Sequence, residues 1–147
     1  MSVYWRRRAL ALFLSVFLLA GCSGTAVPPQ VAPVESSQDA RIYKEHLASI
    51  SKKFFSFKES MLSKITFVDR RVEVFGGEVR GQWFEEKETA EKLIQKGDGW
   101  VKEAQIKVQK GQAASQEISH YISLISILMD QGVFEKVEKR YRSLGGN

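Results

Sequence analysis

The chain has 147 residues, of which 22 are Lys or Arg and 17 are Asp or Glu, so its formal charge is +5. This excess of cations is too small to indicate a nucleic-acid-binding surface. Cys22 is the only cysteine, which excludes an intramolecular disulfide and any metal or redox site built from several cysteines.

Residues 1–21 have the pattern of an export signal. Arginines at 6–8 precede an apolar run at 9–20, and this run is shorter than the roughly 20 residues that span a bilayer. A basic segment, a short apolar segment and small residues at the cleavage point are typical of a secretory signal peptide. We therefore predict that 1–21 is a cleaved signal peptide. The alternatives are an uncleaved anchor and a twin-arginine signal, whose fuller motif residues 9–12 do not complete.

The end of this signal, Leu19-Ala20-Gly21-Cys22, resembles the lipobox of bacterial lipoproteins. The resemblance implies cleavage before Cys22, diacylation of its sulfur and acylation of its new amine. More than one acyl chain holds a protein stably at a membrane. Ser23 follows the cysteine, and resemblance to the sorted lipoproteins of Gram-negative bacteria implies the outer membrane, with the domain in the periplasm. Removal of 1–21 takes away three arginines and no acid, which leaves a formal charge of +2.

All three prolines of the chain lie in the segment 22–37, at positions 28, 29 and 33. Proline fixes φ and removes a hydrogen-bond donor, which favours extended, solvated backbone. We predict a semi-rigid tether between the lipidated Cys22 and a helical domain at 38–144, with a reach of at most about 40 to 50 Å. A leader without a spacing role is the alternative.

The segment 38–64 is predicted to be a helix. Ser36 or Ser37 is expected to cap its start, and Asp39 suits the positive end of the helix dipole. Spacings of three and four between apolar residues are typical of the buried face of an amphipathic helix. The residues with this spacing are Tyr43, Leu47, Ile50, Phe54, Phe57 and Met61.

The next stretch, residues 65–84, is ambiguous. Apolar residues at 65, 68, 72 and 75 continue the helical spacing, so we favour a helix that runs to Phe75 and stops at Gly76-Gly77. The alternative is a β-hairpin around the two glycines, because β-branched residues alternate on either side of them. An isolated hairpin is marginal in water, which argues against it.

A second apolar periodicity begins after Trp83. It predicts helices at 84–96 and 100–131, with a break or kink at 97–99, since each interior glycine costs about 1 kcal/mol. Gly132 is expected to end the second of these helices. A last stripe predicts a helix at 133–143, and residues 145–147 are expected to fray. The second periodicity comprises Ala90, Ile94, Gly97, Val101, Ala104, Val108, Gly111, Ser115, Ile118, Ile122, Ile125 and Met129.

The sequence contains no constellation that indicates an enzyme. The two histidines, His46 and His120, have no third ligand at a matching spacing. Four acids at 85, 86, 88 and 91 are interpreted as solvated charges in the opening turns of a helix. The sequence has neither a Gly-x-Ser-x-Gly elbow nor a glycine loop of the phosphate-binding kind. We expect no catalytic residue, no metal and no cofactor.

These features predict an all-α fold, an elongated antiparallel bundle or helical hairpin of three to four helices. With its anchor and tether, this architecture resembles small helical lipoproteins of the pilotin or envelope-scaffold kind, in architecture alone. The expected function is that of a non-enzymatic protein-binding adaptor or assembly factor at the membrane, with an envelope protein as partner. The alternative is a carrier that binds an apolar ligand or lipid between helices, with a groove lined by aromatics such as Phe55, Phe84 and Trp100.

The segment 133–143 is the candidate partner-binding surface. Phe134 and Tyr141 are seven residues apart and share a helix face, with Arg140, Arg142 and two lysines around it. Aromatic side chains ringed by basic ones suit an acidic protein groove or acidic head groups. We expect the two arginines to be exposed and to contribute little to stability. The alternative is that Phe134 and Tyr141 simply close the end of the bundle.

Overall fold

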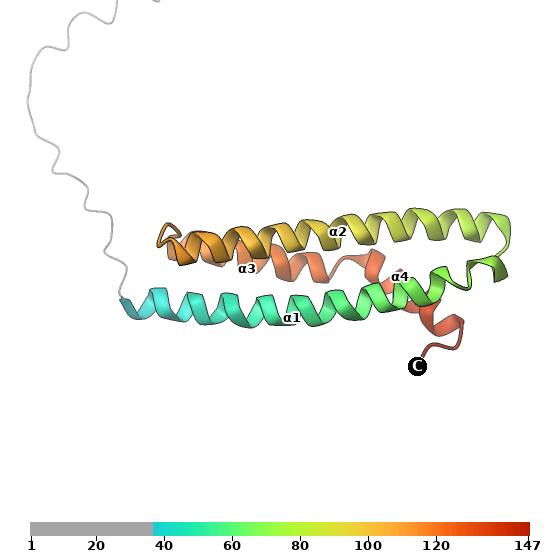
Figure 1. Cartoon of the computed structure of the whole chain (residues 1–147), viewed down its shortest axis with the longest axis horizontal. Coiled ribbons are helices and arrows are strands. Elements are labelled where there is room, and N and C mark those ends of the chain that lie inside the picture. Colours follow the sequence, from blue (N-terminus) through green and yellow to red (C-terminus); the bar gives the residue numbers. More distant parts are fainter. Residues whose placement is uncertain (1–36) are drawn as a thin grey trace, which may run out of the picture. The chain divides into compact units, whose positions relative to one another are not determined.

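The computed structural model describes residues 37–147, in which no residue is in a strand, so the predicted all-α fold is confirmed (Figure 1). No helix in this range is long and apolar enough to cross a membrane. The predictions for the signal peptide, Cys22 and the tether up to residue 36 lie outside the described residues. The helices are α1 (Ser37–Asp69), the 3-10 helix η1 (Val72–Val74), α2 (Gly77–Gln109), α3 (Ser115–Met129) and α4 (Gly132–Ser143).

The helices form an antiparallel bundle of three rods. α1 and α2 have 33 residues each and run side by side in opposite directions, about 50 Å long at 1.5 Å per residue. α3 and α4 follow one another as the third rod, and each packs against both long helices (Figure 1). The predicted helices at 38–64 and 133–143 are confirmed, as parts of α1 and as α4.

The core forms along the two apolar periodicities seen in the sequence. Apolar residues at helical spacing share one face, and the three rods bury these faces against each other. Two clusters of buried side chains are joined by Ile50 and Trp100, which pack against both. The buried members of the two periodicities are Leu47, Phe54, Met61, Ala90, Ile94, Gly97, Val101, Ala104, Ser115, Ile118 and Ile125.

α2 is continuous through Gly97, where the sequence predicted a break, so that prediction is wrong. Gly97 is buried, and a Cβ atom there would lie 2.5 Å from two ring carbons of Phe54. Its neighbour Asp98 reaches across to Lys58 of α1, with 2.5 Å between Oδ2 and Nζ. The glycine therefore allows close approach of two helices, and packing outweighs the roughly 1 kcal/mol that it costs in helix propensity.

The actual break in the second periodicity lies at residues 110–114. Gly111 has φ 66°, and it ends α2 in a Schellman motif. The amide of Gln112 donates to the carbonyl of Lys107 at 2.9 Å, and that of Gly111 donates to the carbonyl of Val108 at 3.1 Å. Gly111 is thus an exposed turn residue, not the core residue that its place in the periodicity predicted.

The connection from α1 to α2 differs from both sequence predictions. α1 ends at Asp69, six residues before Phe75, and the hairpin alternative is wrong because Val72–Val74 form η1. Val72 and Phe75 still pack against the core, because the 3-10 turn returns them to it. Gly77 opens α2 rather than closing α1. The chain must reverse here for α2 to lie against α1, and local helical spacing carries no sign of that reversal.

The third rod breaks at 130–131, and Gly132 begins α4 instead of ending the helix before it. At the far end of α4, Gly145 has φ 81°, and the amide of Gly146 donates to the carbonyl of Tyr141 at 3.0 Å. This second Schellman motif holds residues predicted to fray. The Tyr141 hydroxyl also donates to the carbonyl of Asn147 at 2.9 Å.

Candidate functional site

The residues weighed for catalysis lie on three different helices. His46 on α1 and His120 on α3 are both exposed. The acids at 85, 86, 88 and 91 lie two to four turns inside α2 and not in its opening turns. Glu88 pairs with Lys92 at 2.6 Å, whereas Glu86 has a structural partner on α4. Within 37–147, no group of three or more His, Cys, Asp or Glu residues is placed to hold a metal ion.

The two aromatics of the predicted partner surface face inward. Phe134 is 4% exposed, and its ring stands edge-on to that of Phe57 with 4.8 Å between centroids. Tyr141 is half-buried and stands edge-on to Phe67 at 4.9 Å. The alternative expectation, that these side chains close the end of the bundle, describes what they do. Phe134 is a core residue and is not available on the surface.

Arg140 is a strut between α4 and α2. Its Nε donates to Oε2 of Glu86 at 2.5 Å, and a second guanidinium nitrogen donates to Oε1 at 3.1 Å. The two side chains are only 17% and 15% exposed. Paired planar groups of this kind form the strongest charge-assisted hydrogen bonds. The expectation that Arg140 is an exposed charge is therefore wrong.

Arg142 does lie on the surface, with 73% of its side chain exposed and Glu138 3.1 Å away. Glu138 also accepts a hydrogen bond from Lys64 of α1, and this bond is the main reason why the pKa of Glu138 lies below its usual range. α4 is thus held on one side by Arg140 and on the other by Glu138. The two charge pairs fix the rotation of α4 about its own axis.

An open pocket of about 490 Å³ lies between α2 and the outer face of α4, and we call it the α4 pocket. Because Arg140 neutralises Glu86, the positive charge in the lining of this pocket comes from its two lysines. Lys139 pairs with the exposed Glu135 at 3.1 Å, and Lys136 forms no ion pair with any residue in the described range. The lining residues are Gln82, Glu86, Lys136, Lys139, Arg140 and Ser143.

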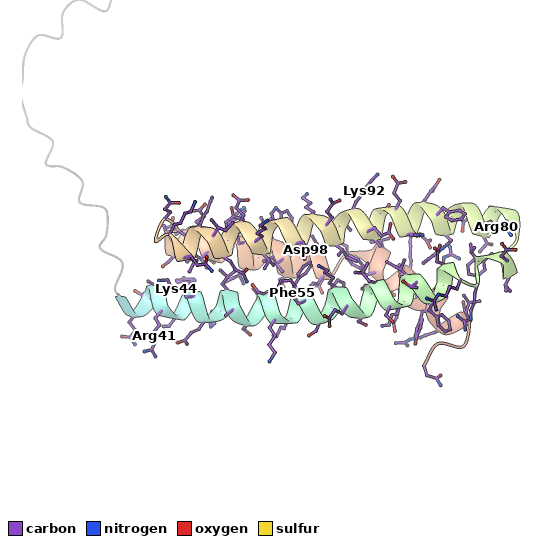
Figure 2. The ribbon with its side chains drawn as sticks, viewed as in Figure 1. Arg41, Lys44, Phe55, Arg80, Lys92 and Asp98 are labelled. Carbon is purple, nitrogen blue, oxygen red and sulfur yellow. The ribbon has the colours of Figure 1, made fainter. Side chains whose placement is uncertain are left out.

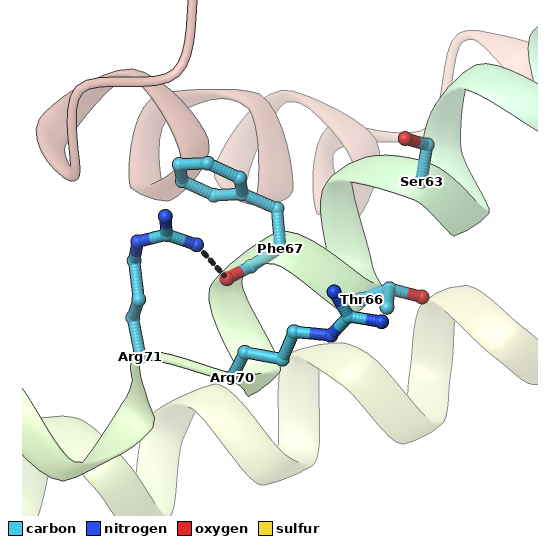
Figure 3. A pocket seen from close by; sticks show the side chains of 5 residues that line it. All are labelled: Ser63, Thr66, Phe67, Arg70 and Arg71. Atoms are coloured by element: carbon cyan, nitrogen blue, oxygen red, sulfur yellow. Dashed lines mark hydrogen bonds between the residues drawn. The ribbon is translucent and has the colours of Figure 1, made fainter.

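A second basic pocket, of about 400 Å³, lies on the last turns of α1 (Figure 3). Ser63, Thr66, Phe67, Arg70 and Arg71 line this pocket, which we call the arginine pocket. The predicted helix to residue 75 contains both arginines, so the sequence does not single them out. The sequence feature that could have indicated this pocket is the pair Arg70-Arg71 directly after Asp69.

The aromatics that the sequence left without a place do not form a common groove. Phe55 is 43% exposed and lines a pocket of about 290 Å³ beside the Lys58–Asp98 pair, where α1 faces α2 (Figure 2). Phe84 is exposed on α2, and Trp100 packs against both core clusters. Each of the three surface pockets described above has at most one aromatic side chain in its lining.

The chain matches no known protein family model, no curated protein and no solved structure.

Proposed function

We propose that this protein is a membrane-anchored envelope lipoprotein that acts as a non-enzymatic protein-binding adaptor or assembly factor. Its anchor is the lipid on Cys22, and its place is the outer membrane of a bacterial envelope, with the bundle in the periplasm. The lipobox-like end of the signal and the proline-rich segment after it support the anchor. The partner is an envelope protein with an acidic surface.

The α4 pocket is the observation that carries the adaptor function. It is open, its positive charge comes from Lys136 and Lys139, and the partly buried Arg140–Glu86 pair forms part of its lining. Complementary charge steers a partner and sets its orientation. The basic character predicted for 133–143 is retained in this pocket, although the residues that supply it are Lys136 and Lys139 rather than the two arginines.

The adaptor is better supported than the carrier. A carrier needs a largely apolar concavity with a few polar groups. The described pockets are instead on the surface and lined mainly by polar or charged side chains. The space between the rods is filled by buried side chains, among them Phe54, Trp83 and Ile125, each 0% exposed.

Affinity capture of the full-length lipidated protein from native membranes tests the proposal. We expect one acidic partner to be retained by the wild type and lost progressively as salt is raised, because salt screens exposed charges. The double variant Lys136→Gln/Lys139→Gln should retain less of it. Lys52→Gln/Lys53→Gln is the matched control, since it removes two exposed lysines from α1 that form no described ion pair.

Equal retention by the two double variants would exclude the α4 pocket as the interaction site. The anchor is tested separately by Cys22→Ala, which should move the protein from the membrane fraction to the soluble fraction. A Cys22→Ala protein that is processed and stays membrane-bound like the wild type would contradict the lipidation.

A further inference from the structure

The arginine pocket combines two guanidinium groups with no carboxylate in its lining (Figure 3). It is about 48 Å along α1 from Ser37, at 1.5 Å per residue. It therefore lies at the end of the bundle remote from the point where α1 begins. Arg70 forms no ion pair with any residue in the range 37–147.

Arg71 is held in place before any ligand binds. Its guanidinium carbon lies 3.6 Å from the centre of the Phe67 ring, and one of its terminal nitrogens donates to the Phe67 carbonyl at 3.2 Å (Figure 3). Phe67 in turn packs edge-on against Tyr141 of α4. A guanidinium stacked on an aromatic ring keeps its edge free for planar acceptors and loses little entropy when it binds one.

The carboxylate that directly precedes Arg70 in the sequence does not neutralise these arginines. Asp69 accepts a hydrogen bond from Lys87 of α2 at 2.8 Å and another from Trp83 Nε1 at 3.3 Å. The hydrogen bond from Lys87 is the largest cause of the lowered pKa of Asp69, so its charge is present and already balanced. The pocket thus keeps a local charge of +2.

The position of the pocket limits the kind of anion that it suits. The C-terminal end of a helix carries about half a negative charge, which disfavours a dianion. The Thr66 hydroxyl donates to the Leu62 carbonyl at 2.8 Å, so the two guanidinium groups supply most of the remaining donors. A planar carboxylate matches the guanidinium fork and carries a single negative charge.

We propose that the arginine pocket binds a carboxylate of an acidic protein segment, through Arg70 and the edge of Arg71. This inference rests on the adaptor function and gives it a second contact point, on α1. An acidic partner could bind the arginine pocket and the α4 pocket together. It would then contact the same end of the bundle on two sides of α4.

The test is fluorescence anisotropy of a labelled oligoglutamate peptide titrated with the full chain in a neutral detergent. We expect Arg70→Gln to weaken binding about tenfold, the effect of one lost charge-assisted contact. Arg71→Lys keeps the charge but removes the fork, and it should also weaken binding. Arg41→Gln is the matched control: it lies near the start of α1, about 44 Å from Arg70, in an exposed pair with Glu45, and should leave binding unchanged.

Equal weakening by Arg70→Gln and Arg41→Gln would mean that only the overall charge matters, and would overturn the inference. Absence of peptide binding by the wild type would overturn it as well. If inorganic phosphate displaces the peptide at lower concentrations than glutarate does, the site prefers phosphate and the carboxylate assignment is wrong.

Capture from native membranes separates this inference from the adaptor function. If Arg70→Gln captures the partner normally while Lys136→Gln/Lys139→Gln does not, the adaptor function holds and the arginine pocket is not part of it. If the wild type captures no partner yet binds the peptide through Arg70, the pocket binds carboxylates and the adaptor function fails.

Discussion

The two halves of the third rod are attached to the long helices in different ways. α3 buries Ile118, Ile125 and Leu128, and its one described ion pair to a long helix joins Glu117 to Lys107. α4 buries only Phe134 and Val137 and adds charge pairs on both flanks, to α2 and to α1. Apolar burial is non-directional, whereas hydrogen-bonded charge pairs set an orientation. The difference suggests that α3 supplies stability and that α4 presents a surface at a fixed angle.

The largest effect should come from the loss of a buried apolar side chain. Phe54→Ala removes a ring with no exposed surface that lies against Gly97 and should cost about 3 to 5 kcal/mol of unfolding free energy. Phe55→Ala, one residue along and 43% exposed, should cost less than about 1 kcal/mol. Denaturant unfolding of the two variants measures both values. Similar losses would show that the close contact of α1 with α2 does not dominate stability.

A smaller effect is expected in α4, where the side chains of Arg140 and Arg142 are 17% and 73% exposed. Arg140→Ala leaves Glu86 partly buried without its partner and should cost about 2 kcal/mol. Arg142→Ala removes an exposed pair and should cost less than about 0.5 kcal/mol. The comparison uses thermal or denaturant unfolding of both variants under the same conditions. An Arg140→Ala protein as stable as Arg142→Ala would mean that the strut does not hold α4.

The smallest effect is the response to acid of the charge pairs between helices. The pKa values of Glu138 and Asp69 are lowered in the folded protein, mainly by hydrogen bonds from Lys64 and Lys87. Unfolded carboxylates bind protons at higher pH than these folded ones do. The stabilisation is therefore complete above the ordinary values, 4.5 for Glu and 3.8 for Asp, and is lost as pH falls through the lowered values.

We expect the Tm to change little between about pH 7 and pH 5 and to fall at lower pH. Glu138→Gln should reduce this fall, because it removes one of the groups responsible. Glu135→Gln, which alters an exposed pair on the same helix, should retain the full fall. Identical pH profiles for the two variants would indicate that the acid response arises elsewhere in the chain.

Helical periodicity predicted most of the fold, and its errors share one cause. Local spacing of apolar residues is visible in the sequence alone. It predicted the apolar face from Tyr43 to Met61 and the helix at 133–143. Gly97 is predicted to break a helix but lies inside α2. Gly132 is predicted to end a helix but begins α4. A glycine in a sequence signals freedom from a side chain. Whether that freedom serves a turn or a close contact depends on what lies against it.

The candidate sites also separate what local sequence predicts from what contacts between distant residues decide. The sequence by itself determined that the fold is helical, where most of the apolar faces lie, and that 133–143 is basic, because these properties depend on residues close together in the chain. Only the tertiary structure decided that Arg140 is bound to Glu86, 54 residues away. It also decided that Asp69 pairs with Lys87, which leaves the neighbouring Arg70 without an ion pair in the described range. A charge is available for binding only when no partner from another helix neutralises it, and that partner is chosen by the packing of the rods.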